Sequence, residues 1–130
     1  RARNSAIMQE ALRGLRGVRV PATPAGHAHY RCMAYAHAAA DRPKLLAALV
    51  RAGLQANIGS CSEIYREPIF AQHGLAPTNA LPVAHALGET SIALVVHHTI
   101  DEVTMHRHAG EVRSALESVD ATRAESGRGG

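Results

Sequence analysis

The sequence is poor in aromatic residues and contains no tryptophan. Three Tyr and one Phe occur among 130 residues, and 14 basic residues exceed 11 acidic residues by only three, which gives a formal net charge of +3. The basic residues are spread along the chain and are not interleaved with aromatic rings, so the pattern typical of a nucleic-acid-binding surface is missing. We therefore expect no nucleic-acid partner.

Cysteine and long apolar runs are also scarce. Two cysteines, Cys32 and Cys61, are too few for a disulfide-based fold and match no zinc-finger spacing, so we expect both to be reduced. No stretch approaches the roughly 20 apolar residues that cross a bilayer, and no signal-peptide run follows the first residues. These features predict a soluble, cytoplasmic protein with no membrane partner. Hydrophobic residues make up 46% of the chain, which is enough for a packed core.

The hydrophobic periodicity predicts helices that alternate with short strands. Helices are expected over residues 7–15, 41–53, 79–87 and 99–119, and strands over residues 18–20, 29–36, 54–58 and 92–96. Asp41 is expected to cap the second helix, and Thr99 with Glu102 forms a capping-box pattern for the last one. This order is typical of an α/β or α+β layer, in which a small sheet is covered on one face by helices.

One domain is expected over residues 1–119, followed by a mobile tail over residues 120–130 that is rich in Ala, Arg, Ser and Gly. Helical spacing of Ile7, Ala11 and Leu15 begins close to the first residue, which is not Met. We therefore expect the chain to be cut from a longer protein. The apolar face of this first helix is expected to mediate self-association.

Residues 59–78 lack clear periodicity, and a long irregular segment in a small domain is more often a functional loop than filler. This segment holds Cys61 between two serines, with Glu63 two residues further on. A cysteine nucleophile needs an activating base such as histidine, and none is near in the sequence. Unless the fold brings one close, Cys61 is a structural cysteine.

Nine histidines raise the hypothesis of a metal site. The spacing disfavours it, because His106 and His108 would lie about 200° apart on a helix and cannot bind one ion. No histidine pair has a cysteine or carboxylate at ligand spacing. We therefore predict that the histidines are surface residues and that the chain holds no metal.

The only lysine, Lys44, raises a second hypothesis, a Schiff base with an aldehyde cofactor. Such a lysine must be desolvated or lie near another cation, so that its amine is partly neutral. Lys44 is expected in the first turn of a helix beside Asp41 and Arg42, where a solvated surface charge is the simpler interpretation. We predict no catalytic residue in this chain.

Four stretches carry a family resemblance, and they follow one another in order along the chain. They are residues 42–54 (RPKLLAALVRAGL), 57–70 (NIGSCSEIYREPIF), 81–91 (LPVAHALGETS) and 93–100 (ALVVHHTI). Together they resemble the C-terminal part of the DegT/DnrJ/StrS-type aminotransferases, over residues 1–119. Val96 and His98 stand where that family commonly has prolines.

The resemblance implies the C-terminal small domain of a fold-type-I enzyme that depends on pyridoxal phosphate (PLP), with a small, mostly antiparallel sheet covered by helices. Such enzymes mostly aminate ketosugars carried on nucleotides, with an amino acid donor that we expect to be glutamate. Their N-terminal domain holds the Schiff-base lysine, and it is missing here. The resemblance therefore implies that this chain alone is inactive and holds no cofactor covalently.

The resemblance also implies that the segment 59–70 lies near the mouth of the active site. By position we predict Ser60, Ser62, Glu63 and Tyr65 as ligands of the sugar nucleotide, since hydroxyl, carboxylate and phenol groups bind sugar hydroxyls. The alternative for this segment is packing between domains or subunits.

Two other functions stay open for the chain as a whole. It could be a non-catalytic binding or assembly module, or a histidine-rich metal-binding protein. For a domain cut from its parent enzyme we expect a homo-oligomer, because a domain without its neighbour exposes an apolar face.

Overall fold

The computed structural model describes residues 1–59 and 63–126, with side chains up to residue 120. Its helices are α1 (Ala2–Ala11), α2 (Arg42–Arg51), α3 (Pro68–Gln72), α4 (Pro82–Thr90) and α5 (Glu102–Ser126), with short 3-10 helices η1 (Ala39–Asp41) and η2 (Ile64–Arg66). Its strands are β1 (Val18–Arg19), β2 (Cys32–Ala36), β3 (Ala56–Asn57) and β4 (Ser91–Leu94). No helix in the described ranges has the length and apolar character needed to cross a bilayer.

The four strands form one sheet in the order β1-β2-β4-β3. Every pairing is antiparallel, and Cys32 lies opposite Leu94 in the central pair. All four residues of β4 are buried, because this strand has a neighbour on each side and helices against it. The predicted fold class, a small antiparallel sheet covered by helices, is therefore confirmed.

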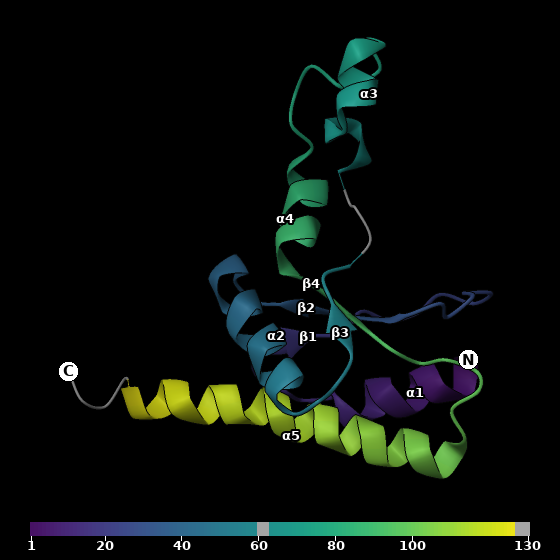
Figure 1. Ribbon diagram of the computed structural model, residues 1–130, viewed down its shortest axis with the longest axis vertical. Helices are drawn as coiled ribbons and strands as arrows, with labels where there is room; N and C mark the ends of the chain where they lie inside the picture. Colours follow the sequence, from purple (N-terminus) through teal and green to yellow (C-terminus); the bar gives the residue numbers. More distant parts are fainter. Residues whose placement is uncertain (60–62, 127–130) are drawn as a thin grey trace.

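Three helices enclose the core with the sheet. α1 and α2 each pack against α5, and the three lie beside the sheet in Figure 1. The helix expected over residues 99–119 lies within α5, and its apolar side chains at helical spacing are buried, since Met105, Val112 and Leu116 are at most 2% exposed. Burying a side chain of this size contributes roughly 1.5–3 kcal/mol.

The apolar face of α1 belongs to this core. Ile7 and Ala11 pack against the buried cluster, and Leu15, which follows the helix because α1 ends at Ala11 and not at residue 15 as expected, is 8% exposed in the same cluster. The expectation that this face is free for self-association is therefore wrong, because α5 already covers it.

α2 ends as the sequence predicts. Gly53 has a φ of 73°, which side chains with a Cβ rarely adopt. The Leu54 amide donates to the carbonyl of Leu49 at 3.0 Å, which closes the last turn. The chain then enters the sheet with Leu54 buried.

The segment 63–90, which we call the arm, differs from the prediction. Residues 59–78 were expected to lack regular structure, yet η2 and α3 occupy part of that range. Pro68 and Pro82 stand at the first positions of α3 and α4, where a fixed φ favours a helix and the missing N–H has no partner to lose. α4 also continues past Gly88, the predicted end, and Arg42 donates a hydrogen bond to the Gly88 carbonyl.

The start and end of α5 also differ from the prediction. Asp101, and not Thr99, caps the helix, with its carboxylate accepting hydrogen bonds from the amide of Thr104 at 2.9 Å and its hydroxyl at 2.8 Å. A carboxylate has two oxygens for these donors, whereas Thr99 is engaged with His97 at 2.8 Å. α5 then continues to Ser126, beyond the expected start of the tail. The mobility of residues 120–130 stays a prediction.

The arm leaves and re-enters the sheet at one place. The Gly59 amide donates to the Ser91 hydroxyl at 3.1 Å, so the residue before the arm lies against the first residue of β4. A Cβ at position 59 would lie 2.8 Å from that hydroxyl, which explains why glycine suits this crossing. From here the arm projects away from the sheet (Figure 1).

Candidate functional site

Two of the four predicted substrate ligands lie in the described part of the chain. Glu63 precedes η2 directly, and Tyr65 is its second residue. Both side chains are partly exposed on the arm. Ser60 and Ser62, as well as Cys61, lie outside the described residues.

The Glu63 carboxylate joins the two halves of the arm. Its Oε1 accepts a hydrogen bond from the Tyr65 hydroxyl at 2.8 Å, and its Oε2 accepts one from Arg66 Nη1 at 3.2 Å. His85 Nδ1, on α4, lies 3.0 Å from the same Oε2. The Glu63 side chain is only 13% exposed as a result. A residue before η2 is thereby connected to a helix 22 positions further along the chain.

Tyr65 extends the connection to the start of α4. Its hydroxyl oxygen accepts a hydrogen bond from the Leu81 amide at 3.3 Å while its hydrogen goes to Glu63. Hydrogen bonds from Tyr65, His85 and Arg66 hold the pKa of Glu63 below its ordinary value. The bond to Glu63 in turn raises the pKa of Tyr65. At neutral pH the pair is a carboxylate acceptor and a phenol donor.

This network limits what the two residues can offer a ligand. Both carboxylate oxygens of Glu63 and the phenol hydrogen of Tyr65 are used within the arm. Each carboxylate oxygen still has lone-pair capacity, so a sugar hydroxyl could donate to it. Their role as substrate ligands stays a prediction. The arrangement itself does one thing, which is to hold η2 and α4 together.

Sequence reasoning did not identify Arg66 and His85 as members of this cluster. Arg66 could have been found from its spacing, since it follows Glu63 by three positions and oppositely charged residues at this spacing face each other on a helical turn. No spacing in the sequence points to His85, because only the fold brings it to Glu63.

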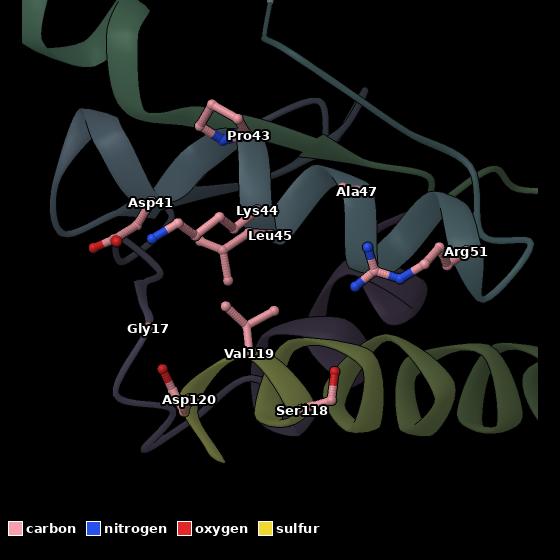
Figure 2. A pocket seen from close by; sticks show the side chains of 10 residues that line it. All are labelled: Gly17, Asp41, Pro43, Lys44, Leu45, Ala47, Arg51, Ser118, Val119 and Asp120. Carbon is pink, nitrogen blue, oxygen red and sulfur yellow. The ribbon is translucent and has the colours of Figure 1, made fainter. Parts of the chain in front are cut away.

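A cavity of about 630 Å³ lies elsewhere, between α2 and α5. Lys44 and Asp41 point toward one end of it and Arg51 toward the other (Figure 2). The residues around it are Gly17, Asp41, Pro43, Lys44, Leu45, Ala47, Arg51, Ser118, Val119 and Asp120. None of these belongs to the predicted substrate site, which is on the arm.

The cavity allows a test of whether this chain could hold PLP through its only lysine. Lys44 is exposed, in the first turn of α2, with acidic Asp41 beside the same cavity. A Schiff-base lysine has to be desolvated or lie near another cation, and an exposed position beside a carboxylate provides neither. The surroundings of Lys44 therefore do not fit the cofactor.

Four of the nine histidines form two ring pairs. The rings of His27 and His29 lie 4.8 Å apart, and those of His97 and His98 lie 4.2 Å apart. Within residues 1–59 and 63–120, no three His, Cys, Asp or Glu side chains converge as metal ligands would. A metal site therefore finds no support in this part of the chain.

Comparison with known proteins gives matches among solved structures alone. No protein-family model matches the sequence, and no curated protein sequence does. An aminotransferase from Psychrobacter cryohalolentis is 26% identical over 92% of this chain, with a TM-score of 0.78. A DegT DnrJ EryC1 StrS aminotransferase from Brucella abortus is 24% identical over 87%, with a TM-score of 0.67. A 3-amino-5-hydroxybenzoic acid synthase is 23% identical over 90%, with a TM-score of 0.68.

In each case this chain matches only part of the longer structure, namely 34%, 29% and 33% of the three chains. The shared fold covers about nine-tenths of this chain. The resemblance predicted from the sequence is thus confirmed by structure: the chain has the fold of about one third of a DegT/DnrJ/EryC1/StrS-type aminotransferase.

Proposed function

We propose that this chain is the small C-terminal domain of a PLP-dependent aminotransferase that transfers an amino group from glutamate to a nucleotide-linked ketosugar. The observation that carries the proposal is the match to the Psychrobacter cryohalolentis aminotransferase over 92% of this chain. The four sequence stretches that resemble the same family support it independently. The name of the 3-amino-5-hydroxybenzoic acid synthase shows that related folds also serve products other than sugars, so the sugar rests on the sequence resemblance.

In this proposal the cofactor is held by the rest of the enzyme and acts there as the electron sink. The role of the present chain is to border the substrate site with its arm. Ser60, Ser62, Glu63 and Tyr65 bind the sugar nucleotide, with Glu63 accepting hydrogen bonds from sugar hydroxyls. The enzyme works as a homodimer in the cytoplasm, and the isolated chain is inactive.

The cofactor assignment is tested by adding PLP to the 130-residue chain and to its Lys44→Ala variant. We expect no Schiff-base absorbance band with either protein. A band that forms with the native chain and vanishes in the variant would show that Lys44 holds the cofactor, against the proposal.

The activity is tested with the protein encoded by the complete reading frame, glutamate and a panel of nucleotide-linked ketosugars. We expect an amino sugar product and 2-oxoglutarate. Within that assay Tyr65→Phe should raise KM for the sugar nucleotide about tenfold, because it removes the hydroxyl that this proposal places on the sugar nucleotide together with its hydrogen bond to Glu63. Tyr30→Phe is the matched control, because Tyr30 is 67% exposed and lies outside the arm. No amine product from any ketosugar would contradict the proposal.

A further inference from the structure

The arm has no hydrophobic core of its own. None of the residues 63–90 is buried, in contrast to α1, α2 and α5, which all contribute to the central core. Five of the nine large apolar side chains that are exposed in the described part of the chain lie on the arm. They are Ile64 at 58%, Ile69 at 54%, Leu75 at 69%, Leu81 at 45% and Val83 at 72% exposure.

The helices of the arm are too short to be stable by themselves. α3 has five residues and α4 has nine, whereas isolated helices shorter than about 12–15 residues are marginal in water. The side-chain links between the elements of the arm are the contacts of Glu63 with Tyr65, Arg66 and His85, together with the hydrogen bond that the Tyr65 hydroxyl accepts from the Leu81 amide. Arg66 and His85 are more than half exposed, and ion pairs of exposed side chains contribute little. Local packing therefore does not account for an ordered arm.

The polar and the apolar side chains of the arm differ in what they contact. The polar groups of the Glu63 cluster bond to one another, so their charges are matched within the arm. The five large apolar side chains are exposed, and large apolar side chains that gather on one surface element mark a place that another protein surface covers. The chemistry fits a predominantly apolar partner surface and not a charged one.

The comparisons indicate what that surface belongs to. The matched aminotransferase chains are about three times as long as the part that this chain matches, and the match covers 87–92% of its residues. The unmatched residues are too few to contain the whole arm, so at least part of the arm occurs in structures with about twice as much additional polypeptide. We infer that this additional polypeptide supplies the surface that covers the apolar side chains of the arm.

We propose that the arm is a docking element whose apolar side chains insert into an apolar groove on the cofactor-binding part of the same enzyme, and that this docking orders the arm. The inference rests on the proposed function, because it requires that cofactor-binding part. In this proposal the two kinds of side chain on the arm have different roles. The apolar side chains dock, and the Glu63 cluster holds η2 and α4 together so that they dock as one unit.

Hydrogen exchange measured by mass spectrometry tests this proposal. The 130-residue chain is compared with the protein encoded by the complete reading frame, at several concentrations. We expect amides of residues 63–90 to exchange at least about tenfold more slowly in the complete protein, because docking suppresses local opening. Amides of α5 are the internal reference, since its core stripe is buried in both proteins.

A pair of matched double variants of the complete protein tests the surface itself. Ile69→Ser with Val83→Ser should restore fast exchange in the arm. Val50→Ser with Val103→Ser should not, because these residues are 65% and 81% exposed on α2 and α5. Exchange in α5 reports whether each variant is folded.

Each other outcome overturns the docking proposal. Equal exchange of the arm in both proteins would show that nothing covers it. Arm protection that rises with concentration in the 130-residue chain, together with a dimer in sedimentation, would identify a second copy as the occupant. A complete protein that aminates sugars while its arm exchanges freely contradicts the docking alone, and one that protects its arm without aminating contradicts the proposed function alone.

Discussion

The side-chain amide of Asn4 donates to the backbone carbonyl of His97 at 2.8 Å, although 93 positions separate the two residues. The same Nδ2 also donates to the Ile100 carbonyl at 2.9 Å. Asn4 is 1% exposed, so these bonds are shielded from water. They fix the start of α1 to the turn that leads from the sheet into α5.

Replacing Asn4 should therefore destabilise the whole domain. Asn4→Ala removes two hydrogen bonds and leaves two carbonyls without this donor, and we expect a loss of about 2 kcal/mol in the free energy of unfolding. Urea denaturation followed by circular dichroism measures it. Ser114→Ala, on the exposed face of α5, should stay within about 0.5 kcal/mol of the native protein. Equal effects of the two changes would contradict the role of Asn4.

Met105 should be among the most sensitive core positions. It is 0% exposed in the apolar stripe of α5, so Met105→Ala leaves a cavity and should cost about 2–5 kcal/mol. Val103→Ala, two residues earlier at 81% exposure, should cost far less. Thermal unfolding of both variants compares them, and a small effect at Met105 would show that the core can close around the cavity.

Asp101 caps α5 in the structure, whereas the sequence predicted Thr99, and substitutions of the two residues should therefore differ in their effect on stability. Asp101→Ala should lower the unfolding midpoint more than Thr99→Ala, because Asp101 accepts both hydrogen bonds from Thr104. Those bonds hold the pKa of Asp101 below its ordinary value of 3.8. Its contribution is therefore present above pH 3.8 and is lost as the pH falls through the lower, folded-state pKa. Urea midpoints of the two variants at neutral and acid pH measure this difference.

The Glu63 cluster should respond to acid in the same direction. The folded-state pKa of Glu63 lies below its ordinary value of 4.5, so the stabilisation that it gives the arm is complete above pH 4.5 and declines as the pH falls through the folded pKa. Glu63→Gln should remove this acid dependence and should also lower the raised pKa of Tyr65 toward 10. Absorbance titration of phenols, with Tyr65→Phe to assign the signal, checks the second effect. Glu117→Gln, in an exposed pair with Arg113, should leave the titration unchanged.

Cys32 should be unreactive in the folded protein. It is 1% exposed, and burial raises the pKa of its thiol to about 11, so little thiolate forms at pH 8. In a Cys61→Ser variant, which leaves Cys32 as the only thiol, a thiol reagent should react slowly until denaturant unfolds the chain. Rapid reaction under native conditions would contradict the buried position of β2.

The periodic parts of the fold could be predicted, whereas the arm was predicted only in part. Met105, Val112 and Leu116 lie at helical spacing, because a helix repeats every 3.6 residues, and this spacing supports the helix expected over residues 99–119. The helix expected over residues 79–87 is found as α4, shifted to Pro82–Thr90. Residues 63–78 have no repeating apolar pattern, since none of them faces a core within this chain, and periodicity therefore missed η2 and α3. Pro68 was the local signal for the start of α3.

By itself, the sequence determined that residues 41–53 and 99–119 form helices and which family the chain resembles, because these depend on local spacing and on motifs. The tertiary structure alone decided that β4 lies between β2 and β3, that Asn4 reaches His97, and that His85 reaches Glu63. These relationships join residues that are distant along the chain. Their energies depend on which surfaces meet after folding, and no local pattern of residues encodes that.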